Sequence, residues 1–355
     1  VLNFNGLDLA EDLIAILRPL ATHGISLVRY IDRVASHVLD HGMPDIVCFC
    51  GVIHMADKRM VNACRKRSIP TVGIQHGGSV GTHERSMAEI CGVGWCDYYL
   101  TYGDGIKASD VSIVPISIVP TRASLIPVGS LVLEKRTSGM RKHKTSYGEC
   151  VRVLWITDKS YGNTVGHDNR LEDTSRYLLH KRCVEMLGKC TGVDLTIRPF
   201  KSTEEMLGTV RWINSDTNLD VRIDTISSLD DLLTENDLVI TDNTASTVWN
   251  EAIVFGKPLI LFCDPEQTIL MHDFIRDLEQ SCCWCRTEKE LIDTIEKLIR
   301  EGSEYVRELS QIDTSQYIKK YVLHSDDCRA IDRAVRFLLE LNLPLVTLPA
   351  TMESS

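Results

Sequence analysis

The 355-residue sequence has no apolar run long enough to cross a bilayer. Its longest apolar runs, such as residues 46–53 and 258–263, fall well short of the ~20 residues that a membrane-spanning helix needs. The first residues also lack the basic stretch that opens a secretory signal peptide. We therefore predict a cytoplasmic protein without a transmembrane segment, which leaves peripheral contact with a membrane open. The chain begins at Val1 and not at Met, so a fragment lacking an upstream portion is an alternative to a complete chain.

A surplus of basic residues is also missing. The chain has 39 Lys and Arg against 49 Asp and Glu, which gives a formal net charge of −10. This charge argues against a nucleic-acid partner bound by bulk electrostatics, although a local basic cleft stays open. The hydrophobic content of 44% and the charged content of 25% are those of an ordinary globular protein, and the length suggests about two domains.

The cysteines do not show the spacing of a zinc finger or of a disulfide framework. The 13 cysteines are scattered, and several lie in apolar runs, among them Cys48, Cys50 and Cys263. This usage predicts reduced, buried thiols of the kind found in the cytosol. The one cluster, residues 282–285, has no second paired half, so a packed strand is favoured over a structural metal site. No Asp-x-Asp metal motif lies beside a predicted strand end.

Short apolar strands alternate with helical segments in both halves of the chain. Residues 6–42 predict two helices, and strands follow at residues 45–51 and 69–74 with a helix between them. The alternation resumes with a strand at residues 151–157. Strand–helix–strand alternation implies a parallel sheet covered by helices. Between the halves, residues 134–149 are polar and basic, which favours a solvated linker.

Residues 237–264, DLVITDNTASTVWNEAIVFGKPLILFCD, predict a strand, a polar turn, a helix and a second strand. A helix start offers unpaired N–H groups and a partial positive charge, which favour a phosphate. Glu251 lies one turn into the helix and could accept hydrogen bonds from a ribose. The alternative is a capped helix with a solvated Glu. The side chains proposed to hold a donor phosphate here are Asn243, Thr244, Ser246 and Thr247.

A second polar loop follows the predicted strand at residues 71–74. The loop reads Gln75-His76-Gly77-Gly78, and its glycines allow positive φ and close approach of the backbone. His76 is a side chain that can accept a proton near neutral pH, so we take it as a candidate general base. Glu84 and Glu89 follow the loop, and either is a candidate second acid/base group or partner of His76. A solvated helix face is the alternative for both.

Arg198 ends the predicted strand at residues 193–199. Because a guanidinium pairs with phosphates and carboxylates through two hydrogen bonds, Arg198 is a candidate clamp for the donor.

Two separated motifs carry a resemblance to known families. The Ser/Thr-rich turn with Asn250-Glu251-Ala252 and Gly256-Lys257-Pro258 resembles the donor-nucleotide segment of glycosyltransferases with the GT-B fold. Sugar-nucleotide epimerases and teichoic-acid-type glycerophosphotransferases carry similar segments. GIQHGGSVG at residues 73–81, followed by DYYLTYG, resembles a family of transferases for bacterial surface carbohydrates. Two positions depart from the related patterns: Tyr102 stands where this family usually has Trp, and Phe200 departs from the pattern of sialyl- and Kdo-type transferases.

The resemblance implies an α/β fold of two Rossmann-like domains with parallel sheets and a cleft between them. The implied division is an acceptor domain at residues 1–135, a linker at 136–150 and a nucleotide-sugar-binding domain at 151–323. A C-terminal crossing helix at 324–345 and a disordered tail at 346–355 complete it. In such folds the turn holds the donor phosphate, the Glu holds the ribose, and a glycine such as Gly129 approaches the donor at the cleft.

The predicted function is that of a metal-independent glycosyltransferase. It would move a sugar from a nucleotide-activated donor to a surface-polysaccharide, glycan or lipid-linked acceptor, with no cofactor and no bound metal. Three alternatives share the fold: transfer of a polyol phosphate from a CDP-alcohol, sugar-nucleotide 2-epimerisation, and a binding module without activity.

Overall fold

The computed structural model describes residues 3–4, 7–8, 10–52, 54–78, 80–83, 93–106, 123–138, 148–157, 173–199, 212–215, 218–242, 247–266, 268 and 270–342. Five predicted site residues lie outside these ranges: Glu84, Glu89, Asn243, Thr244 and Ser246.

The first half of the chain forms a four-stranded sheet in the order β3-β4-β5-β6. Every neighbouring pair in this sheet is parallel, as the strand–helix alternation predicted. A short antiparallel pair, β1 (Asn3–Phe4) with β2 (Leu7–Asp8), precedes it. The strands of the sheet are β3 (Val47–Phe49), β4 (Thr71–Ile74), β5 (Tyr98–Thr101) and β6 (Ser124–Pro127).

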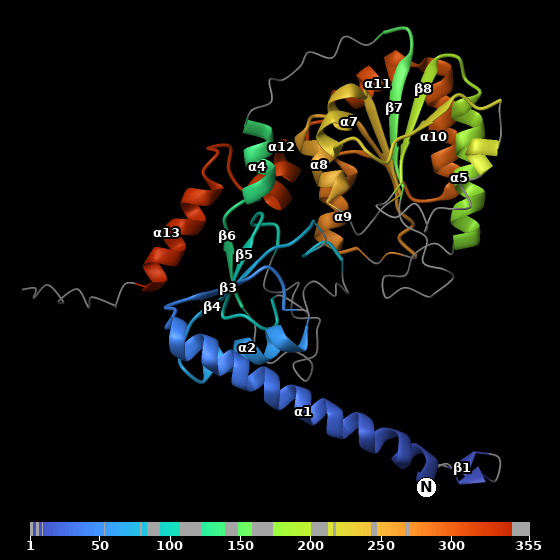
Figure 1. The fold of residues 1–355 in the computed structure, drawn as a ribbon. Coiled ribbons are helices and arrows are strands. Elements are labelled where there is room, and N and C mark those ends of the chain that lie inside the picture. Colours follow the sequence, from blue (N-terminus) through green and yellow to red (C-terminus); the bar gives the residue numbers. More distant parts are fainter. Residues whose placement is uncertain are drawn as a thin grey trace, which may run out of the picture.

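A single long helix, α1 (Ala10–Gly42), replaces the two helices predicted for residues 6–42. Neither Pro19 nor Gly24 ends it, because each weakens a helix without forbidding one. The helix projects from the first lobe of the molecule and packs on α2 (Met55–Arg65) through its C-terminal half (Figure 1). Ala35 and Leu39 lie in the apolar cluster between the two helices.

Substituting Gly24 with alanine is expected to stabilise α1 by about 1 kcal/mol, because a Cβ there meets no atom within 4 Å and Ala is the better helix former. Gly256 is the matched control. It has equally open surroundings but a φ of +67°, so Gly256→Ala is expected to destabilise the fold by about 1 kcal/mol. Amide hydrogen exchange within α1 and thermal unfolding measure the two effects. If both substitutions changed the free energy of unfolding in the same direction, the helical position of Gly24 or the positive φ of Gly256 would be wrong.

The second half forms a six-stranded parallel sheet in the order β12-β11-β10-β7-β8-β9. This is the doubly wound order in which the strand connections reverse direction between β7 and β10, and such sheets bind ligands outside the carboxyl ends of the strands at that point. The strands are β7 (Val151–Ile156), β8 (Val193–Arg198), β9 (Val221–Ile223), β10 (Leu238–Thr241), β11 (Leu259–Phe262) and β12 (Cys283–Cys285).

Helices cover both faces of this second sheet (Figure 1). Alternate residues of β7 point to opposite faces, since Val153 and Trp155 join one apolar core and Leu154 and Ile156 join the other. The first core is closed by α5 (Asp173–Gly188), α10 (Glu288–Glu301) and α11 (Ser303–Leu309). The second is closed by α7 (Leu229–Glu235), α8 (Val248–Val254) and α9 (His272–Glu279).

Two connections join the halves. The first is α4 (Leu131–Ser138), whose Leu133 is buried in a core of the second half, so the first three residues of the predicted linker at 136–150 are helical. The second runs through α12 (Ser315–Ile318), the π-helix η2 (Lys319–Leu323) and α13 (Ala330–Asn342). On α13, Ala334 and Phe337 pack against the first sheet, so this helix lies on the first half.

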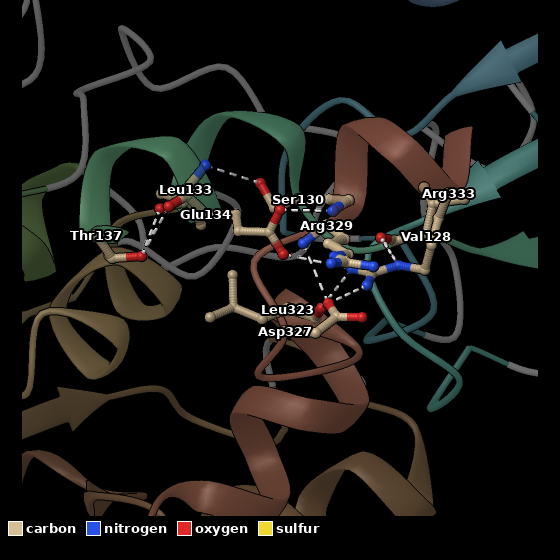
Figure 2. Close-up of polar contacts among 10 residues, drawn as sticks. Val128, Ser130, Leu133, Glu134, Thr137, Leu323, Asp327, Arg329 and Arg333 are labelled. Atoms are coloured by element: carbon tan, nitrogen blue, oxygen red, sulfur yellow. Dashed lines mark hydrogen bonds and ion pairs between the residues drawn. The ribbon is translucent and has the colours of Figure 1, made fainter. Parts of the chain in front are cut away.

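The buried carboxylate of Glu134 ties α4 to the start of α13 (Figure 2). Glu134 accepts a hydrogen bond from the Ala330 N–H at 2.6 Å and one from the Arg333 guanidinium at 3.3 Å. Arg333 also donates to the Val128 carbonyl at 2.8 Å. The network therefore fixes α4, the end of β6 and α13 relative to one another.

Glycines at the ends of β5 and β6 let the backbone of η2 approach the first sheet. A Cβ on Gly103 would lie 1.9 Å from the Lys320 carbonyl oxygen, and one on Gly129 would lie 2.6 Å from that of Leu323. Gly129 also has a φ of +94°. The close approach of Leu323 therefore explains a glycine at position 129 structurally. The predicted approach of Gly129 to the nucleotide-sugar donor stays a prediction.

Every cysteine in the described ranges is a free thiol. Cys263 is buried as predicted, but Cys48 and Cys50 are exposed, and burial was the wrong prediction for these two. The physical reason is the position of β3, which is an edge strand of the first sheet and not a covered central one. No helix in the part of the chain that the structure describes is long and apolar enough to cross a membrane.

Candidate functional site between the two halves

The loop after β4 is held in place by the buried side chain of Gln75. Its amide nitrogen donates to the Gly77 carbonyl at 2.9 Å, and its amide oxygen accepts from the Tyr102 N–H at 2.8 Å. Gly77 has a φ of +87°, a conformation that other residues rarely adopt. Between these fixed neighbours, the His76 side chain is exposed. His76 is therefore exposed on a backbone segment whose neighbours are held by hydrogen bonds.

This loop packs directly against the first turn of α8. A Cβ on Gly78 would lie 2.3 Å from the Asn250 side-chain nitrogen, and one on Gly77 would lie 3.9 Å from the Thr247 methyl carbon. Only the absence of a side chain at Gly78 allows this approach. The two motifs that the sequence singled out are thus brought together, one from each half of the chain.

The contact between the halves continues along the chain beyond Gly78. The Thr82 carbonyl accepts the Met271 N–H at 2.9 Å, and His83 forms an isolated antiparallel bridge with Leu270. The His83 ring lies 6.2 Å from the ring of Trp249. The loop is therefore docked on the second half at several points.

Two buried N–H donors of α8 face this loop. The side chains of Trp249 and Asn250 are fully buried, and both nitrogens lie within 3.4 Å of the position that a Cβ on Gly78 would take. Asn250 accepts a hydrogen bond from the Tyr317 hydroxyl at 2.7 Å, but neither nitrogen has an acceptor among the described residues. Unmade hydrogen bonds of buried donors cost free energy and are often found where a ligand or water completes the site.

Glu251 lies at the boundary between the halves. It is 8% exposed and accepts a hydrogen bond from Arg136 of α4 at 2.6 Å. Tyr102 belongs to the same neighbourhood. Burial raises the pKa of Tyr102, hydrogen bonds with Ser130 and the Gly77 backbone oppose this, and the charge of Glu251 adds to it. The carboxylate predicted to hold a ribose therefore faces residues of the first half.

Asp242, the residue directly after β10, is a buried anion. It accepts hydrogen bonds from the His180 ring at 2.9 Å and from the Trp155 indole at 3.3 Å, and the Arg176 guanidinium lies 3.6 Å away. Burial alone would raise its pKa, but the charge and hydrogen bond of His180, with Arg176 and Trp155, outweigh burial and lower it to about 2. Asp242 opens the polar turn predicted within residues 237–264 and had no predicted role of its own, although a carboxylate directly after a buried strand is a signal.

Arg198 ends β8, as predicted, with its guanidinium engaged by Asp224. It donates to the Asp224 carbonyl at 3.2 Å and lies 3.5 Å from the carboxylate. Within the described part of the chain, these contacts tie Arg198 to the connection after β9. Its predicted role as a phosphate clamp stays a prediction.

The two parallel sheets, each covered by helices and facing one another across these contacts, define the GT-B class of two Rossmann-like domains, as predicted from the sequence. Residues 47–296 match the LIC12162 family of transferases. Since the match covers most of the chain, the protein belongs to this transferase family.

Solved structures of the same fold have low sequence identity to this chain. S. aureus MnaA, solved with UDP, is 16% identical, with 89% of this chain and 82% of that chain covered and a TM-score of 0.57. The UDP-GlcNAc 2-epimerase of Neisseria meningitidis, bound to UDP-GlcNAc, is 14% identical, with 88% and 81% covered and a TM-score of 0.56. Anabaena HepE in complex with UDP is 13% identical, with 89% and 82% covered and a TM-score of 0.51. Sequence comparison with curated proteins gives no match.

Proposed function

We propose that this protein is a glycosyltransferase that moves a sugar from a nucleotide-activated donor to a surface-polysaccharide, glycan or lipid-linked acceptor, without a metal or a cofactor. The observation that carries the proposal is the packing of the His76 loop on the first turn of α8. The residues directly after His76 pack on this helix start, which supports a proton acceptor acting near a bound phosphate. Membership of a transferase family supports a transfer reaction.

The donor half of the proposed site belongs to the second domain. In this proposal the donor phosphates are bound by Thr247 and by the predicted residues Asn243, Thr244 and Ser246. Glu251 takes the ribose hydroxyls, and Arg198 adds positive charge toward the phosphates. The solved structures with UDP or UDP-GlcNAc favour a uridine nucleotide as the first candidate.

The chemistry requires a base and a stabilised leaving group. An acceptor hydroxyl oxygen attacks the anomeric carbon, His76 takes the hydroxyl proton, and the bond from that carbon to the donor phosphate oxygen breaks. The nucleotide leaves with the electron pair, and fixed dipoles stabilise its charge. Glu84 is the candidate partner or second acid/base group.

A thermal-shift titration of the wild type and of Thr247→Ala with UDP, GDP, CDP and CMP tests the donor site. We expect one nucleotide to add about 2.7 kcal/mol of stability to the wild type at 100 times its Kd, with or without Mg²⁺, and much less to the variant. Thr191→Ala is the control, because Thr191 is exposed in the turn before β8, at the amino ends of the strands and not at their carboxyl ends. No shift with any nucleotide would overturn the proposal.

The bound nucleotide then selects the sugar donors to be assayed. Product analysis by NMR separates acceptor-dependent transfer, which releases the nucleotide, from epimerisation, which changes the sugar and keeps the nucleotide attached. An epimerised sugar nucleotide without release of free nucleotide would replace the transferase assignment with the epimerase alternative.

A further inference from the structure

The guanidinium of Arg136 lies between two carboxylates of the second half. Its Nε donates to Asp230 of α7 at 3.1 Å, and Nη2 makes a second hydrogen bond to the same carboxylate. Its Nη1 donates to Glu251 Oε1 at 2.6 Å. The guanidinium also lies over the Phe255 ring, 5.4 Å from its centre. Arg136 was predicted only as the first residue of a solvated linker, so these contacts give it an unforeseen position.

The geometry leaves part of Glu251 available. One edge of the planar Arg136 guanidinium donates two hydrogen bonds to Asp230, and a third N–H donates to Glu251 Oε1. These bonds fix the orientation of the guanidinium relative to the Glu251 carboxylate. Among the described residues, Glu251 Oε2 has no hydrogen-bond donor, and the side chain is 11% exposed. A carboxylate with one oxygen held and the other open is oriented for a ligand hydroxyl.

The helix that carries Arg136 is itself fixed. Glu134, two residues earlier, is buried against the start of α13, and Leu133 lies in a core of the second half. Burial of the Arg136 guanidinium opposes its charge, but Asp230 and then Glu251 outweigh burial and raise its pKa above the ordinary value. Arg136 is therefore a charged guanidinium whose position is fixed by Asp230 and Glu251.

We propose that Arg136 is a positioning residue of the donor site, which holds one oxygen of Glu251 so that the other receives a ribose hydroxyl of the nucleotide. This inference rests on the proposed function. It adds that α4, outside the predicted nucleotide-binding domain, contributes to recognition of the ribose through Arg136.

The test compares UDP with 2′,3′-dideoxy-UDP by isothermal titration of the wild type and of Arg136→Gln. A hydrogen bond to a charged group is worth about tenfold in affinity, so the wild type is expected to prefer UDP by about that factor. Arg136→Gln is expected to lose this preference by weakening UDP about tenfold, with the dideoxy nucleotide changed less than about twofold. A purely structural role would weaken both nucleotides equally.

Three further variants complete the test. Glu251→Gln is expected to reproduce Arg136→Gln, and Arg136→Lys, which keeps the charge without the planar fork, to restore part of the preference. Asp231→Asn is the control, because Asp231 is exposed on the same helix as Asp230 and pairs with Ser228, and it is expected to keep the preference. A wild-type preference retained in Arg136→Gln would overturn the inference alone. A wild type that binds none of UDP, GDP, CDP and CMP would overturn the proposed function and this inference with it.

Discussion

Replacing His76 with alanine is expected to slow sugar transfer by about 10²–10⁴-fold, the usual contribution of a positioned general base. Nucleotide affinity is expected to change less than about twofold, because the variant removes an exposed side chain and leaves the Gln75 contacts that hold the loop. The expected loss therefore falls on kcat. Steady-state rates with the donor selected by binding, together with titration of the nucleotide, measure the two parts separately.

Imidazole and a matched histidine make the His76 experiment specific. Added imidazole is expected to restore part of the activity of His76→Ala, because a small base can occupy the space of the lost ring. His37→Ala is the control, since His37 is exposed on α1, which lies on the far side of the first half from the second half (Figure 1). Full activity in His76→Ala would remove His76 as the base and would leave Glu84 as the candidate to examine.

Much of the fold could be predicted from the sequence, because its signals are local. The β-branched runs at residues 151–156 and 238–241 form β7 and β10, the two central strands of the second sheet. The prediction of two helices in residues 6–42 failed for the converse reason. A glycine and a proline have a local cost, and whether a helix continues past them depends on the whole helix.

The partners within the candidate site could not be predicted in the same way. Arg136 meets Asp230 and Glu251 at separations of 94 and 115 residues, and the basic stretch around it has the composition of a linker. From the sequence, Gly78 was a candidate because glycine has a flexible backbone. In the structure, glycine is required there because a Cβ would collide with the Asn250 side chain. Such contacts depend on how two domains dock, and hydrophobic periodicity carries no information about docking.

Asp242→Asn is expected to lower the free energy of unfolding by about 3–5 kcal/mol at pH 7, the cost of breaking a buried ion pair. The shift of the Asp242 pKa from 3.8 to about 2 accounts for about 2 kcal/mol of this. The rest arises because an amide NH₂ would face the His180 or Trp155 donor and because Arg176 loses a carboxylate contact. Urea unfolding followed by fluorescence and circular dichroism measures the difference.

The pH dependence separates this ionic contribution from a packing effect. The folded-state pKa of Asp242 lies below its unfolded value, so the carboxylate stabilises the fold fully above pH ~3.8 and loses this contribution as the pH falls toward 2. The difference in the free energy of unfolding between wild type and Asp242→Asn is therefore expected to decrease below pH ~4. The same urea titration measures both proteins at each pH. Asp231→Asn, which changes an exposed carboxylate on α7, is the control and is expected to cost less than about 1 kcal/mol. A difference in the free energy of unfolding that stays constant down to pH ~2.5 would show that the shape of the Asp242 side chain, and not its charge, stabilises the fold.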